Sequence, residues 1–181
     1  MENGIDSKIG KEVKSSAILR ERARKLAREA KNEETDGFME VVEFRIGEEQ
    51  YAVGSLHVGE VFPVREITPV PCTPSFVAGI VNLRGRIVSI VDLKVFFDIP
   101  RTDITGKSRI IILRSREMEL GILTDAIAGV RCIPLRGIHP PLPTMTGVRA
   151  AYLLGLAGED LVVLDGAKLL GDVSLVVNEE V

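Results

Sequence analysis

The sequence predicts a mainly β protein of two similar small barrels, preceded by an amphipathic helix. Its apolar runs are short and separated by turn residues, which suits small barrels better than one open sheet. Hydrophobic residues make up 45% of the chain but aromatic residues only 4%, so the core is mostly branched aliphatic side chains, which favour strands. The second half of the chain also repeats the first, as two similar β-subdomains would.

The repeat runs without a gap through the first strands of each half. Its aligned pairs are Phe44 with Leu113, Tyr51 with Leu120, Val53 with Ile122, Val58 with Ile127 and Val61 with Val130. Further on, residues 88–92 match residues 161–165, and each run ends in an aspartate before a short helix-like segment. Two halves with one strand order predict two subdomains, but they leave open whether a strand crosses between them.

Residues 1–36 precede the predicted β domain, which spans residues 37–175 and leaves a tail at 176–181. The first 14 residues are polar and are expected to be disordered. Residues 16–34 predict a helix with a narrow apolar stripe, formed by Ile18, Leu19, Ala23, Leu26, Ala27 and Ala30. A solitary helix is marginal in water, so this one packs on its own domain, frays, or docks on a second protein.

A hairpin in the middle of the chain is the clearest local signal. Residues 80–83 and 87–91 are β-rich apolar runs, and Arg84-Gly85 between them is a turn in which glycine accepts a positive φ. Further strands are predicted at 41–46, 50–53, 58–64, 110–113 and 119–123.

Two short helical segments should flank this hairpin. Thr73 followed by Pro74 resembles an N-cap with proline in the first helical position, which predicts one turn of helix up to Gly79. Asp92 should cap a second short helix, from Leu93 to Phe97. Residues 134–147 contain four prolines and two glycines, so they predict an irregular loop that either joins strands or also recognises a partner.

Charge and hydropathy exclude several classes of protein. A net charge of −3 offers no general attraction to nucleic acid or an anionic membrane. No apolar run approaches the ~20 residues that span a bilayer, and the N-terminus lacks the apolar core of a signal peptide. The sequence therefore predicts a cytoplasmic protein without membrane insertion.

Neither a metal site nor a cofactor site is predicted. Cys72 and Cys132 lie outside any ligand spacing and are interpreted as reduced, partly buried side chains. The two histidines, His57 and His139, are far apart in the sequence.

Catalysis is not predicted either. Asp92, Asp125 and Asp165 are the carboxylates expected near apolar strand ends, so a catalytic pair is conceivable. Asp92 and Asp165 hold equivalent repeat positions before helices, however, which is typical of N-caps. Neither a Ser-His-Asp arrangement nor a glycine-rich phosphate loop is present.

Three motifs together resemble the signature of the CheW family: Thr73-Pro74, residues 79–85 (Gly-Ile-Val-Asn-Leu-Arg-Gly) and residues 87–93 (Ile-Val-Ser-Ile-Val-Asp-Leu). The similarity extends from roughly residue 40 to residue 170. Members of this family are built as two five-stranded SH3-like barrels around a shared core. The resemblance therefore implies this fold for the chain. One departure is Ser89, where the family often has proline, which puts the exposure of that strand in question.

The resemblance also implies a function. CheW proteins are non-catalytic adaptors, without a cofactor, that couple methyl-accepting chemoreceptors to the histidine kinase CheA within a signalling array. The implied partners are the CheA regulatory domain and the cytoplasmic tip of the receptors. A CheW-like scaffold of a related pathway, such as motility or biofilm control, is the alternative. A small-ligand or enzymatic barrel would need a pocket with convergent polar groups.

Site residues follow from the resemblance, position by position. Chemoreceptor tips dock in a groove between the barrels, and a docked helix is read by apolar anchors. The implied groove residues are Val58, Gly79, Asn82, Arg84, Gly121, Ile127 and Val130. Any of them could instead be a plain core residue. The kinase surface is assigned more loosely, to exposed strand edges around Tyr51, Phe62 and Val64.

Arg84 is the charged residue most in need of explanation, because it lies in a mostly apolar hairpin and a buried guanidinium requires a carboxylate partner. The resemblance supplies Glu60 as that partner in a structural ion pair. The alternative is a solvated turn residue. A buried pair predicts that Arg84→Ala costs roughly 2–4 kcal/mol.

Overall fold

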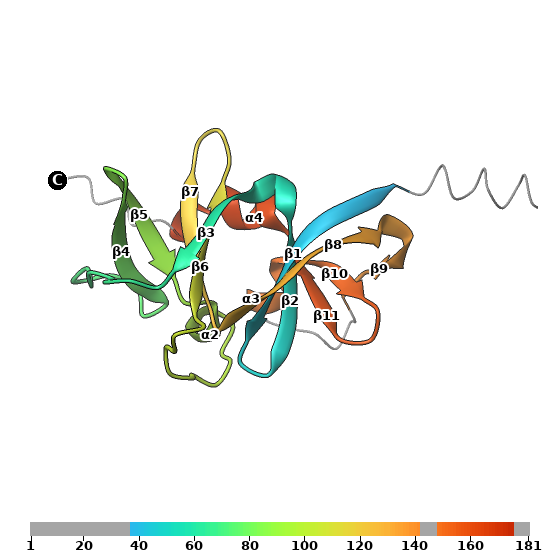
Figure 1. Cartoon of the computed structure of the whole chain (residues 1–181), viewed down its shortest axis with the longest axis horizontal. Coiled ribbons are helices and arrows are strands. Elements are labelled where there is room, and N and C mark those ends of the chain that lie inside the picture. The colour runs from blue at the N-terminus through green and yellow to red at the C-terminus, as the bar shows by residue number, and fades with distance from the viewer. Residues whose placement is uncertain (1–36, 142–147, 176–181) are drawn as a thin grey trace, which may run out of the picture. The chain divides into compact units, whose positions relative to one another are not determined.

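The computed structural model describes residues 37–141 and 148–175, and in these the chain forms two β-sheets (Figure 1). The six-stranded sheet has the order β8-β1-β2-β11-β10-β9, and the five-stranded sheet has the order β3-β6-β7-β5-β4. The prediction of a mainly β protein is confirmed. The predicted helix at 16–34 and the tail at 176–181 lie outside the described residues.

The strands are β1 (Phe38–Ile46), β2 (Glu49–Gly54), β3 (Val58–Pro63), β4 (Val77–Leu83), β5 (Arg86–Val91), β6 (Arg109–Arg114), β7 (Glu119–Thr124), β8 (Ala126–Pro134), β9 (Ile138–His139), β10 (Leu153–Ala157) and β11 (Leu161–Leu164). The α-helices are α2 (Leu93–Phe96), α3 (Val148–Ala151) and α4 (Gly166–Gly171). The 3-10 turns are η1 (Ser55–His57), η2 (Leu135–Gly137) and η3 (Val173–Leu175).

Each sheet is assembled from both halves of the repeat. The hairpin β1-β2 pairs with β8 and β11 of the second half, while the hairpin β6-β7 pairs with β3 and β5 of the first. The order β8-β1-β2-β11-β10 corresponds strand for strand to β3-β6-β7-β5-β4, with one parallel pair at the same place in each. Strands therefore cross between the subdomains, and the question that the sequence left open is answered.

The edges of the five-stranded sheet are linked by the chain, although no pairing among the described residues joins β3 to β4. After β3 the chain crosses to the opposite edge, where Thr68 forms an isolated bridge with Ile80 of β4. In the six-stranded sheet β8 and β9 lie at opposite edges in the same way, with η2 between them. In each sheet one bent segment of the chain thus connects the two edge strands, but within the part of the chain that the structure describes no backbone pairing between those strands closes the sheet into a barrel.

Alternating strand residues divide the apolar side chains into three clusters. One lies on the five-stranded sheet alone and includes Val88, Ile90 and Ile110. A second lies on the six-stranded sheet alone and includes Val41 and Val163. The largest cluster draws residues from both sheets, among them Phe44, Tyr51, Val91, Leu93, Ile111, Leu113, Ile122, Val162 and Leu164. The two sheets therefore share a buried core, and each has a smaller core of its own.

Aromatic side chains concentrate in the shared core. Tyr51 stacks between Phe44 and Phe97, and Tyr152 contacts Phe96 and Phe97. Because α2 follows β5, the two phenylalanines of this segment come from the five-stranded side, whereas Phe44 and Tyr51 come from the other sheet. Most of the few aromatic rings of this chain thus lie at the junction of the two sheets.

The two predicted aspartate caps are confirmed. Asp92 accepts a hydrogen bond from the backbone N–H of Lys94, and Asp165 accepts from those of Ala167 and Lys168. Each side chain satisfies N–H groups that a helix start leaves without partners.

Two local predictions are wrong. The helical turn predicted from Thr73 to Gly79 is absent: Val77 N–H bonds to Pro74 O in a tight turn, and β4 starts at Val77. Cross-strand pairing with β5 outweighs the local Thr-Pro signal here. Cys72 and Cys132 are free, as expected, but both are exposed rather than partly buried.

The position of Ser89 is resolved by the topology. Ser89 lies on β5, which runs between β7 and β4, and its side chain is buried. The strand is therefore internal to its sheet. Within the described residues, no helix is both long enough and apolar enough to cross a membrane.

Candidate partner-binding surface

The tip of the β4-β5 hairpin is built by a two-residue turn. Both Arg84 (φ 53°) and Gly85 (φ 87°) have a positive φ, as the mirror-image turn favoured in hairpins requires. The side chain of Asn82 braces the turn by accepting a hydrogen bond of 2.8 Å from the Gly85 N–H. Asn82 therefore shapes the backbone that presents Arg84 to solvent.

An ionic cluster surrounds this tip. Arg84 Nη2 lies 3.3 Å from Glu60 Oε2, and Arg86 Nη2 lies 3.5 Å from Glu60 Oε1. Arg86 also contacts Glu119 on β7. Because Glu60 belongs to the edge strand β3 and Arg84 follows the opposite edge strand β4, the pair connects the two edges of the five-stranded sheet.

Arg84 has the partner that the resemblance implied, but not the predicted burial. Its side chain is 80% exposed and that of Glu60 is 25% exposed. Water screens such a pair, so it contributes at most about 1 kcal/mol to folding. The structure favours the alternative of a solvated turn residue, and the loss of roughly 2–4 kcal/mol, which assumed a guanidinium withdrawn from water, does not apply to this geometry.

Val58 and Ile127 occupy equivalent places in the two sheets. Val58 begins the edge strand β3, and Ile127 lies near the start of the edge strand β8. Both are partly buried against the shared core. Val130, further along β8, is 60% exposed. The structure thus brings Val58 and Ile127 to one cluster from different sheets and leaves Val130 open to solvent.

Gly79 lies on the edge strand β4 and Gly121 on the internal strand β7 of the five-stranded sheet. A Cβ at Gly79, where φ is 140°, would stand 2.3 Å from the carbonyl oxygen of Thr68. A Cβ at Gly121 would stand 2.3 Å from Ile90 Cδ1. These glycines allow backbone and core atoms to approach closely, and both are buried.

The residues expected to contact the kinase also differ in how much they are exposed to solvent. Tyr51 is fully buried beneath the Arg149 guanidinium, so the expectation that it marks an exposed edge is wrong. Phe62 and Val64 pack, partly buried, against the core of the five-stranded sheet. Elsewhere on this segment, Val61 is 39% exposed, and Leu56 in η1, before the start of β3, is 95% exposed. Leu56 went unnoticed because a lone apolar residue in a turn has no periodicity.

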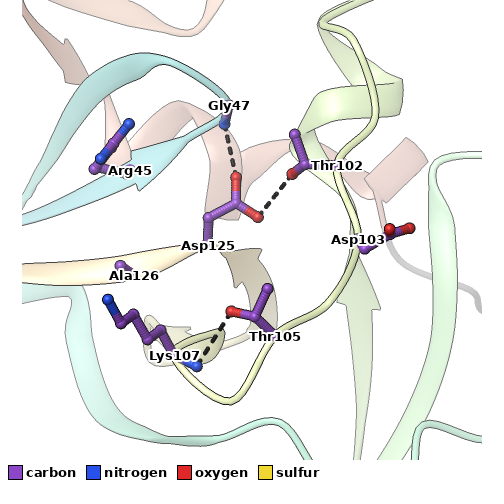
Figure 2. A pocket seen from close by; sticks show the side chains of 8 residues that line it. All are labelled: Arg45, Gly47, Thr102, Asp103, Thr105, Lys107, Asp125 and Ala126. Carbon is purple, nitrogen blue, oxygen red and sulfur yellow. Dashed lines mark hydrogen bonds between the residues drawn. The ribbon is translucent and has the colours of Figure 1, made fainter.

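Asp125 organises a surface pocket of about 240 Å³ (Figure 2). Its carboxylate accepts a hydrogen bond of 2.7 Å from the Gly47 N–H and one of 3.1 Å from the Thr102 hydroxyl. A third partner is Lys94, whose side chain is only 2% exposed. Asp125 is thus a structural acceptor with its bonds already committed. Sequence reasoning missed Lys94, because lysine in a short helix is usually solvated.

Each of the three aspartates considered for catalysis therefore has a structural role instead. Asp92 and Asp165 are helix caps, and Asp125 is held by an ammonium group and a backbone amide. In the described part of the chain, no group of three His, Cys, Asp or Glu side chains is arranged to hold a metal ion.

The sequence that forms these two sheets matches a known family model over most of the chain. A model of the CheW-like domain matches residues 40–174. The chain belongs to the CheW-like domain family. Its match ends close to the limits of the β structure, from β1 to η3.

Individual CheW relatives agree with this assignment. The "Chemotaxis protein CheW" of Treponema pallidum is 31% identical over 77% of this chain and 86% of its own. "Protein FrzA" of Myxococcus xanthus is 33% identical over 62% of this chain and 70% of its own. The crystal structure of the scaffolding protein TtCheW from Thermoanaerobacter tengcongensis superposes with a TM-score of 0.64 at 35% identity, covering 70% of this chain and 88% of that one.

Proposed function

We propose that this CheW-like chain is a non-catalytic chemotaxis adaptor that couples chemoreceptors to the histidine kinase CheA in the cytoplasm. The observation that carries the proposal is the family match over residues 40–174, supported by relatives named chemotaxis protein CheW and by a solved scaffolding protein. Each open sheet, with its bent connecting segment, would be one SH3-like unit of that family. Coupling would be allosteric: the adaptor changes kinase output by binding two kinase arrangements with different affinity.

The proposed receptor surface contains Val58, Ile127 and Val130, with Asn82 and Arg84 at its wall. Val58 and Ile127 come from different sheets but pack on one cluster, and Val130 exposes a branched apolar side chain nearby on β8. An amphipathic receptor helix would place its apolar anchors on such side chains. Gly79 and Gly121 would act indirectly, by keeping β4 and β7 in place.

The proposed kinase surface lies at the end of β3. Phe62 and Val64 expose part of their apolar surface there, whereas Val61, which is 39% exposed, points to the opposite face of the strand. Because the CheA regulatory domain is itself CheW-like in this family, the contact would be one β subdomain against another. Residues 1–36 would be accessory to both surfaces.

Calorimetric titration with the CheA regulatory domain from the same genome tests the kinase contact. We expect micromolar or tighter binding, both for the full chain and after deletion of residues 1–36. A folded chain that binds no CheA domain of its own genome would overturn the proposal and favour the related-pathway scaffold.

The receptor contact is tested with a soluble receptor-tip fragment and one matched pair of variants. Val130→Asp should weaken binding about tenfold, which corresponds to losing one apolar anchor of about 1.4 kcal/mol. Val173→Asp is the control, because Val173 is even more exposed, at 83%, but lies in η3. Equal affinities for the two variants would contradict the assignment of Val130.

A further inference from the structure

The chain passes from the five-stranded to the six-stranded sheet at Asp125, between β7 and β8. The backbone N–H of Asp125 donates to Arg45 O at 2.9 Å, and its carboxylate Oδ2 accepts from the Gly47 N–H at 2.7 Å. Both partners belong to the β1-β2 hairpin of the six-stranded sheet, Arg45 at the end of β1 and Gly47 in the turn, and Figure 2 shows the carboxylate directed between Gly47 and Thr102. Asp125 therefore holds this end of the hairpin with its backbone and its side chain together.

Lys94 supplies the opposite half of the contact, from α2 at the end of β5. Its ammonium group lies 2.5 Å from Asp125 Oδ1, 2.6 Å from Thr102 Oγ1 and 3.4 Å from Thr102 O. An ammonium group has three N–H donors, and three acceptors surround this one. A charge withdrawn from water is tolerated only when it is paired in this way, so the geometry is strongly specified.

Within the residues that the structure describes, the second crossover, from β2 to β3, has no such contact. In the repeat alignment that places Phe44 on Leu113, Asp125 corresponds to Leu56. In the alignment of Asp92 with Asp165, Lys94 corresponds to Ala167. Both members of the pair are thus replaced together by apolar residues, and Leu56 is 95% exposed. The β7-β8 and β2-β3 crossovers occupy equivalent places in the repeat, but in the described structure only the first is held by this polar contact.

We propose that Lys94, Asp125 and Thr102 form a polar clasp that fixes the orientation of the two sheets at the β7-β8 crossover. The clasp is a positioning device for the proposed partner surface, and this part rests on the proposed function. Val58 and Ile127 lie on different sheets, so a partner that contacts both requires a defined orientation between them. The clasp provides that orientation before the partner binds.

The orientation is measured as the distance between two spin labels by pulsed electron paramagnetic resonance. Cys72 and Cys132 are exposed and are first changed to serine. Labels are then placed at exposed positions of each sheet, on Glu40→Cys in β1 and Arg114→Cys in β6. The full chain is used throughout.

Two clasp variants and one control are compared. Asp125→Ala removes the shared acceptor, and the double variant Lys94→Met with Asp125→Leu removes both charges, so no unpaired charge remains to unfold the protein. Asp165→Ala is the control, because Asp165 is a carboxylate of similar exposure, 20% against 23% for Asp125, whose side chain caps α4 and pairs with Lys168 of the same helix. Far-UV circular dichroism verifies that each variant is folded.

We expect the width of the distance distribution to at least double in both clasp variants and to stay unchanged in the control. An unchanged distribution in the folded double variant would overturn the clasp, whatever the single variant does. Calorimetry with the CheA regulatory domain and with the receptor tip then tests the link to function. If the competent orientation falls to a tenth of the population, the apparent Kd of a partner that spans both sheets rises about tenfold.

The binding measurements and the spin-label distances can contradict the two proposals independently. A wild-type chain that binds neither partner would overturn the proposed function, while the spin-label distances still decide the clasp. Broadened distances with unchanged affinities for both partners would overturn the link between the clasp and binding.

Discussion

Arg84 combines a left-handed backbone, φ 53°, with a side chain that is 80% exposed. Arg84→Ala should therefore lower the free energy of unfolding by less than about 1 kcal/mol, because the ion pair with Glu60 is screened by water. Arg84→Asn should cost still less, since asparagine is favoured at this position of a hairpin turn. Urea denaturation measures both. A loss of 3 kcal/mol for either variant would show that the pair is shielded from water.

At Gly79, by contrast, we expect a much smaller change of side chain to cause a larger loss of stability. Gly79→Ala would strain a backbone with φ 140° and drive a Cβ to 2.3 Å from the Thr68 carbonyl oxygen. We expect the free energy of unfolding to fall by about 2–4 kcal/mol. Gly106→Ala is the matched control, because a Cβ there has no neighbour within 4 Å. If both variants unfold at the same urea concentration, the close approach does not constrain β4.

A hydrogen bond from the Tyr152 hydroxyl to the Asp172 carboxylate links the end of α3 to the start of η3. Burial and then this bond raise the pKa of Tyr152 to about 12 from 10.0. The stabilisation is complete below pH 10, where the hydroxyl is protonated in the folded and the unfolded chain alike. It is lost as the pH rises to about 12, because the unfolded chain ionises first.

Tyr152→Phe should therefore reduce stability most below pH 10, and the difference from the wild type should shrink between pH 10 and 12. Urea denaturation across this range measures the difference. Tyr51, whose pKa burial also raises, is present in both proteins and so cancels. A difference that is constant with pH would contradict the raised pKa of Tyr152.

At the scale of the whole molecule, the exchange of hairpins makes the two sheets interdependent. Residues 37–108 lack the β6-β7 hairpin that their strands pair with, and residues 109–175 lack β1-β2. Each fragment should therefore be unfolded alone, with a poorly dispersed amide NMR spectrum. An equimolar mixture should recover the spectrum of the intact chain. A single fragment with a native-like spectrum would contradict this dependence.

Local features of the fold could be predicted from the sequence. The turn at Gly85 and the caps at Asp92 and Asp165 depend on residues within four positions of each other, so composition and spacing reveal them. The exchange of hairpins could not be predicted, because a period of two tells which side chains are buried but not which strand lies alongside.

The site was harder to predict for the same reason. Gly79 owes its constraint to Thr68, which arrives from the opposite edge of the sheet, and Arg84 sits at a tip whose exposure depends on the curl of that sheet. Lys94 and Asp125 did leave one signal: they are the charged members of repeat positions that hold Ala167 and Leu56 in the other half. A break in an internal repeat is thus a useful pointer to an asymmetric contact.

The placement of the aromatic rings gives this protein a built-in optical probe. The chain has no tryptophan and two tyrosines, and both Tyr51 and Tyr152 belong to the ring cluster where the sheets meet. Its tyrosine emission and near-ultraviolet dichroism therefore report on that junction and on little else. Partner binding or loosening of the sheets can be followed in the unlabelled protein, provided that the partner is free of tryptophan.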